Sequence, residues 1–150
     1  MNVLYGHNDA VVAFVGQLLP GGERGFGACQ TIGALDNEGR LIAGVVYHNY
    51  DPDAKIIEMS GAGIDPHFLT RRFINAMFDY PFLGVGCQMV VFRARIDNER
   101  LLRQLAWYGC TFHRIPRLYG REVDGVVATL TDDEWANNKI NSKRFAREAA

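Results

Sequence analysis

The stretch that decides the fold runs from Lys55 to Tyr80 and reads KIIEMSGAGI followed by DPHFLTRRFINAMFDY. Its first ten residues are rich in apolar and β-branched side chains, which is typical of a strand. Asp65-Pro66 then opens a helix, because an acid and a proline are both favoured in a first turn. Apolar residues recur along one face to Tyr80, and we expect Pro81 to end the helix. A second strand follows at 88–96, and two strands joined by one helix are expected to be parallel.

The segments on either side of this unit add antiparallel strands and further helices. Upstream we expect a short strand, a helix and two strands of a meander that continues into 55–64; these segments are 3–5, 8–19, 29–35 and 41–50. Downstream we expect a helix capped by Asp97 or Asn98, two strands and a capping box; these segments are 98–108, 111–115, 126–130 and 131–134. The order predicts one α+β domain over residues 1–135 with a mixed sheet, followed by a polar tail at 136–150 that is helical but poorly packed.

Composition limits the possible functions. The chain has 150 residues, with 16 Lys and Arg against 17 Asp and Glu, and this balance argues against a dedicated nucleic-acid binder. The nine basic residues between positions 61 and 121 are all arginine, which favours a phosphorylated ligand. The alternative is that these arginines form a solvated face of two helices. The three cysteines lack the spacing of a disulfide framework or a zinc site, and we expect no metal. The apolar runs are too short for a membrane span, and the N-terminus lacks the basic start of a secretory signal, so we expect a cytoplasmic protein without membrane contact.

Several local motifs resemble the GNAT acyltransferase superfamily over residues 3–135. Ile64-Asp65-Pro66 is similar to the hydrophobic-x-Pro that leads into the pyrophosphate loop of that family, and Gly109 follows Asn98 at the family's spacing of eleven residues. Leu118-Tyr119-Gly120 resembles the loop between the last strands. The segments 69–72, 78–82 and 86–87 look like a subgroup found in phages and prophages.

The resemblance implies a GNAT-like mixed, mostly antiparallel sheet, flanked by helices, in which the parallel strands 55–64 and 88–96 splay apart. Acetyl-CoA or another acyl-CoA would bind in that gap, with its pyrophosphate at the start of the following helix. The positions that would bind it are Ile64, Leu69, Thr70, Arg71, Arg72 and Asn98. The implied activity is transfer of an acyl group from CoA to a primary amine by direct attack on the thioester.

The same resemblance suggests catalytic residues. Glu58 stands on the strand where many members carry a general base, and His48 on the neighbouring strand is the second candidate. Leu105 occupies the position of the family's acid tyrosine, so Tyr108 is the candidate acid, with packing as its alternative role.

Two other functions remain open. The segment 69–72 lacks the glycines of the family loop, and Leu105 cannot donate a proton, so the chain could be a binding protein that has lost catalysis. A nucleic-acid-modifying enzyme of the phage type is the other alternative. The expected partners are a CoA thioester and an amine acceptor that the sequence does not identify, and association into a homodimer is left open.

Overall fold

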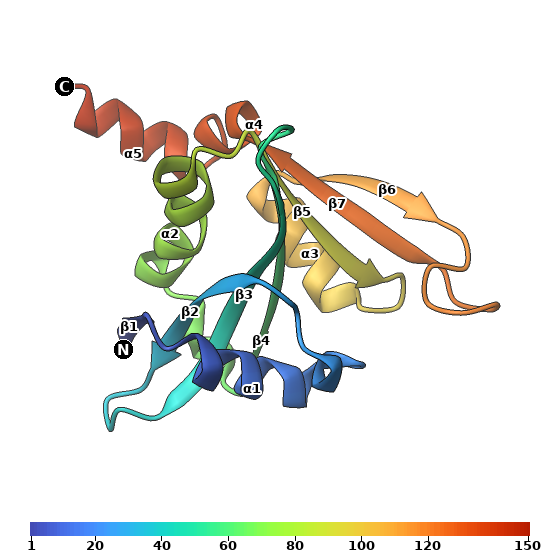
Figure 1. The fold of residues 1–150 in the computed structure, drawn as a ribbon. Helices are drawn as coiled ribbons and strands as arrows, with labels where there is room; N and C mark the ends of the chain where they lie inside the picture. The colour runs from blue at the N-terminus through green and yellow to red at the C-terminus, as the bar shows by residue number, and fades with distance from the viewer. The chain divides into compact units, whose positions relative to one another are not determined.

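The computed structural model describes residues 1–150, which form two compact units, residues 1–87 and 88–150 (Figure 1). The first unit contains the strand-rich half of the chain. Its regular elements are β1 (Asn2–Tyr5), α1 (Asn8–Leu18), a 3₁₀ turn (Gly22–Arg24), β2 (Cys29–Leu35), β3 (Leu41–Asp51), β4 (Ile56–Gly63), a second 3₁₀ turn (Pro66–Phe68) and α2 (Arg71–Asp79). β1 to β4 pair in sequence order and every pair is antiparallel, which confirms the predicted meander.

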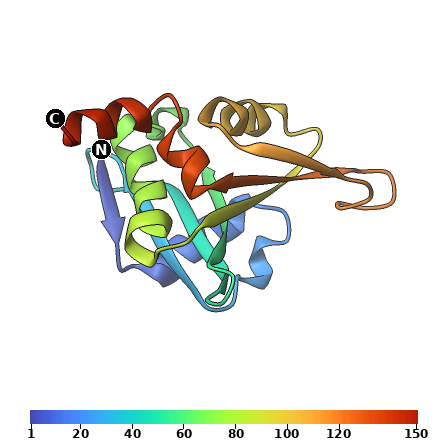
Figure 2. The ribbon, with the colours of Figure 1, turned by 90° about the horizontal axis from the view of Figure 1, so that it is seen from above.

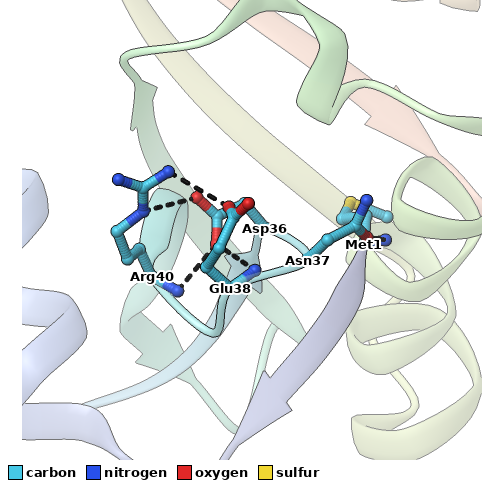
Figure 3. A network of polar contacts seen from close by, with 5 residues as sticks. All are labelled: Met1, Asp36, Asn37, Glu38 and Arg40. Carbon is cyan, nitrogen blue, oxygen red and sulfur yellow. Dashed lines mark hydrogen bonds and ion pairs between the residues drawn. The ribbon is translucent and has the colours of Figure 1, made fainter.

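The turn between β2 and β3 is held by one carboxylate. Asp36 accepts hydrogen bonds from the backbone N–H groups of Glu38 and Arg40, both at 2.9 Å, and from Nε of Arg40 at 2.9 Å (Figure 3). These bonds stabilise the ionised form, and they hold the pKa of Asp36 below its usual range. The aspartate therefore fixes the register of the two strands that it joins.

The helix α1 covers one face of this sheet (Figure 2). Val11 and Val15 are fully buried against Val46 of β3. They come so close to Gly44 that a Cβ at this position would lie 2.6 Å from a methyl of Val11. No side chain caps the start of α1, and the Asn8 side chain accepts hydrogen bonds from Thr31 of β2 instead.

The predicted single helix over 65–80 is wrong, since two caps divide it. Asp65 accepts from the backbone N–H of His67 and starts only a 3₁₀ turn, while Thr70 accepts from that of Phe73 and starts α2. Each side chain satisfies a backbone N–H group at the start of its own short helix, so two short helices form here in place of one long helix.

The predicted stop at Pro81 is also wrong. The chain continues beyond α2 through the widened turns of a π-helix, Tyr80–Val85, and ends at Gly86 with φ +85°. Proline at 81 has no N–H for the carbonyl of Met77, four residues earlier. The buried hydroxyl of Tyr47 donates to that carbonyl instead, at 2.6 Å, and its contact with the Tyr80 ring fixes α2 on the second face of the sheet.

The second unit is a three-stranded antiparallel sheet with three helices. Its elements are β5 (Met89–Arg95), α3 (Glu99–Tyr108), β6 (Thr111–Ile115), β7 (Gly125–Thr131), α4 (Asp132–Ala136) and α5 (Asn141–Glu148). β7 lies between β5 and β6. The predicted capping box is confirmed, with Thr131 and Glu134 bonding each other's backbone N–H groups.

The C-terminal tail is helical as predicted, but the expectation of poor packing is wrong. Ile140 and Asn141 are buried, and the ring of Phe145 lies edge-on to Trp135 at 5.3 Å. Apolar residues spaced through a polar segment were enough to give the tail a buried side. None of the helices is both long and apolar enough to span a membrane.

Candidate functional site

A β-bulge interrupts the pairing of β3 with β4. His48 lies opposite Glu58 and Asp51 lies opposite Ile56, so two residues of β3 face one residue of β4. Asn49, the first of the two, has φ +52°, in the left-handed region that only a few per cent of non-glycine residues adopt. Bulges of this kind re-aim side chains, and they are over-represented next to active sites.

The bulge brings together four polar side chains from β3 and β4, His48, Asn49, Glu58 and Ser60, called here the polar cluster. Nε2 of His48 lies 2.8 Å from Oγ of Ser60 and 3.7 Å from Oε2 of Glu58. Nδ2 of Asn49 donates to Oε1 of Glu58 at 3.1 Å. Residues 48, 58 and 60 share one face of the sheet, because side chains alternate along a strand and His48 pairs with Glu58.

His48 is nearly inaccessible to solvent. Its exposed fraction is 7%, and the ring of Phe26 lies against it with 5.0 Å between ring centroids. Burial lowers the pKa of His48, and the nearby charge of Glu58 only partly opposes this effect. A pKa below 6.5 leaves the imidazole neutral at pH 7, so it can accept a proton.

The polar cluster has the composition of an acid–base site. In a serine-hydrolase triad, the serine and the carboxylate meet different nitrogens of the histidine. Here Ser60 and Glu58 both approach Nε2, which does not have that relay geometry. Cys110 offers no alternative nucleophile, since burial and the charge of Glu134 raise the pKa of its thiol to about 12.

The start of α2 carries three of the residues expected to bind a cofactor, namely Thr70, Arg71 and Arg72. The Thr70 side chain accepts from the N–H of Phe73 at 3.2 Å, and Arg71 is the exposed first residue of the helix. A helix start leaves backbone N–H groups without intrahelical partners, and together with a guanidinium they suit a phosphate. These donors are present at the helix start although segment 69–72 has no glycine.

The side chain of Arg72, the second residue of α2, has contacts with the N-terminal segment. Its Nη1 donates to the carbonyl of Met1 at 3.4 Å, and its side chain lines a groove of about 490 Å³ between β1 and α2 with Tyr5, Asn75 and Tyr80. The Arg72 side chain therefore faces β1, an outer strand of the meander. The sequence could not separate the two arginines. Neighbouring residues of a helix point about 100° apart, but which of them faces a site depends on the orientation of the helix in the fold.

The remaining predicted site residues have structural contacts. Ile64 is 62% exposed and its N–H donates to the carbonyl of Ile42, while Leu69 lies in the loop before α2. Asn98 caps α3, accepting from the N–H of Leu101 at 3.4 Å. The hydroxyl of Tyr108, a residue only 5% exposed, accepts from Nδ2 of Asn141 at 3.3 Å, and this placement favours the packing role over the acid role.

Sequence reasoning missed Asn49 and Ser60. The signal for Ser60 was its spacing of two from Glu58, which puts both on one strand face. The signal for Asn49 was only its residue type, since asparagine adopts the left-handed region more readily than most residues.

Comparisons with known proteins give a fold but no close relative. No protein-family model and no curated protein matches the sequence. Among solved structures, a chimera of the spermidine N-acetyltransferase SpeG from Vibrio cholerae and hSSAT has a TM-score of 0.70 at 14% identity, covering 92% of this chain and 100% of that one. A structure of mutant forms of the spermidine/spermine N-acetyltransferase SpeG from Vibrio cholerae has a TM-score of 0.71 at 13% identity, covering 91% and 97%. A dodecameric structure of the spermidine N-acetyltransferase from Vibrio cholerae has a TM-score of 0.69 at 13% identity, covering 91% and 96%.

These likenesses span nearly the whole chain and show the fold. The predicted class, a mixed α+β fold with a mostly antiparallel GNAT-like sheet, is confirmed. The splay between strands 55–64 and 88–96 concerns strands of two different units and stays a prediction. Membership of the phage-like subgroup also stays a prediction.

Proposed function

We propose that this protein is an acetyl-CoA-dependent N-acetyltransferase that acts on a primary amine. The observation that carries the proposal is the polar cluster, in which Glu58 and a neutral His48 lie together on the strand pair of a GNAT fold. Both groups can accept a proton, as an attacking amine requires.

Glu58 is the proposed general base. An amine attacks the thioester carbonyl with its lone pair, so its nitrogen must lose a proton as the new C–N bond forms and the C–S bond breaks. That proton goes to the Glu58 carboxylate, and the thiolate of CoA leaves. A thiol with a pKa near 8.5 is a tolerable leaving group, so water can supply its proton in place of Tyr108.

Acetyl-CoA is the proposed acyl donor because the start of α2 offers the donors that a pyrophosphate needs. The thioester supplies the activated acetyl group. Thr70, Arg71 and the first N–H groups of α2 would hold the phosphates, and Ile64 and Leu69 come just before this helix in the chain.

The acceptor is proposed to be a cation, with a polyamine as the first to test. Residues 1–60, which include the polar cluster, carry seven acidic residues against three basic ones. An excess of negative charge attracts ammonium groups at a distance. The similar solved structures are described as spermidine N-acetyltransferases, which makes spermidine the natural probe.

A binding protein without catalysis is the second candidate. The buried position of Tyr108 favours it, because this removes the tyrosine that the sequence offered as an acid. A protein of this kind would have the fold and no turnover.

The test is an acetylation assay with acetyl-CoA and spermidine, extended to lysine peptides and small primary amines. Glu58→Gln is expected to lower kcat by roughly 10²–10⁴ and to leave acetyl-CoA affinity unchanged by calorimetry. Glu38→Gln is the matched control, since Glu38 is an exposed glutamate of the β2–β3 turn. Full activity of Glu58→Gln would move the base to His48. Absence of turnover with every amine, together with no stabilisation by acetyl-CoA, would refute the proposed function.

A further inference from the structure

Asn49 holds a backbone conformation that needs an explanation. Its φ of +52° is unfavourable for most L-residues, and glycine would adopt it more easily. Its side chain is exposed, so burial does not account for asparagine at this position. The contact that asparagine adds over glycine is the hydrogen bond from Nδ2 to Oε1 of Glu58, at 3.1 Å.

This bond gives the two oxygens of Glu58 different surroundings. Oε1 is engaged by Asn49, whereas Oε2 lies 3.7 Å from Nε2 of His48, beyond hydrogen-bond distance. Nε2 is 2.8 Å from Oγ of Ser60. The carboxylate is therefore held in front of His48 without being bonded to it.

We propose that Asn49 is a positioning residue that keeps the Glu58 carboxylate apart from His48, so that Oε2 stays free to take the proton of the acceptor amine. The catalytic part of this inference rests on the proposed acetyltransferase function. Without the hydrogen bond from Asn49, a small rotation of the carboxylate brings Oε2 within hydrogen-bond distance of Nε2 of His48. The charged hydrogen bond formed there stabilises the imidazolium and occupies the base.

Glu58 is the charged neighbour of His48, and the other groups around the imidazole are neutral. Ser60 on β4 is neutral, and Phe26 covers the ring. Cys29 lies opposite His48 on β2, and its thiol is neutral because burial and the charge of Asp9 raise its pKa. A change in the position of Glu58 is thus expected to appear in the protonation of His48.

Two variants separate positioning from folding. Asn49→Gly keeps the left-handed backbone without strain and removes the donor. Asn49→Asp keeps the side-chain shape and replaces the donor by a like charge that repels Glu58.

The experiment measures the titration of His48 by NMR and the pH dependence of kcat with acetyl-CoA and spermidine. In Asn49→Gly the pKa of His48 is expected to rise by about one pH unit, because an opposite charge has moved closer. The acidic limb of the kcat profile should move up with it. At neutral pH kcat should fall roughly tenfold in both variants, the equivalent of one charged hydrogen bond, with KM for acetyl-CoA unchanged. Adding Glu58→Gln to Asn49→Gly should abolish the shift of the His48 titration.

A His48 titration that is the same in Asn49→Gly and wild type overturns the proposal, and so does an unchanged kcat profile. A lower melting temperature with an unmoved titration also overturns it, since that is what a purely structural role gives. If the wild type acetylates no amine, the proposed function fails, and the titration by itself decides whether Asn49 holds Glu58 away from His48.

Discussion

The hydrogen bond between Tyr47 and Met77 offers a direct test of how α2 is attached to the sheet. Tyr47→Phe removes one hydroxyl, and the ring that packs against Tyr80 stays in place. Because the shape of the buried side chain is kept, the cavity contribution is small. What is lost is the donor at 2.6 Å to a carbonyl whose normal helical partner, the N–H of residue 81, does not exist in proline.

The expected cost is about 1 to 3 kcal/mol of unfolding free energy, which is the range for leaving a polar group without its partner. For a chain of this length each kcal/mol lowers the melting temperature by roughly 2–4 °C. Urea denaturation measures the cost, and an unchanged m-value shows that the change is in stability alone.

The control is the same substitution in a Pro81→Ala background. Alanine restores an N–H at position 81, which can donate to the carbonyl of Met77, so Tyr47→Phe should cost clearly less there. A double-mutant cycle isolates this coupling. Equal costs in the two backgrounds, or no measurable cost in either, would refute the account of Tyr47 as the substitute donor.

Three further outcomes are expected. Gly44→Ala should destabilise the protein by about 1 to 3 kcal/mol in urea denaturation, because the new methyl would lie 2.6 Å from Val11; a neutral result would mean that α1 is not seated on β3 as described. The pKa of His48 is lower in the folded state than in the unfolded chain, so the unfolded chain binds more protons below pH 6.5. The free energy of unfolding should therefore fall as the pH drops below about 6.5, and this loss should be absent in His48→Gln. Arg71→Ala should weaken acetyl-CoA binding several-fold in calorimetry, as loss of a charged hydrogen bond does, whereas Arg72→Ala should leave it unchanged; equal effects would reject the separation of the two arginines.

Local signals in the sequence were enough to predict the order of the strands and most of the helices, and the family resemblance suggested Glu58 as a base. The alternation and turn residues of segments 29–64 specified an antiparallel meander, because both signals are local. The cap at Asn98 and the capping box at Thr131 were readable for the same reason. The role of Glu58 stays a prediction, made from the resemblance of its strand to one that carries a base in the family.

Features that depend on contacts between distant residues could be seen only in the folded chain. Pro81 has no N–H in any context, yet the chain continues as a helix past it because Tyr47, from a distant strand, supplies the missing donor. Arg71 and Arg72 are equivalent in the sequence, and only the folded chain shows that the Arg72 side chain lies beside Met1 and β1. The polar cluster depends on a bulge that no local pattern announces, since the extra residue in β3 is defined only by its pairing with β4. Local signals are set by the chemistry of neighbouring residues, while the register of two strands and the face of a helix are set by what they pack against.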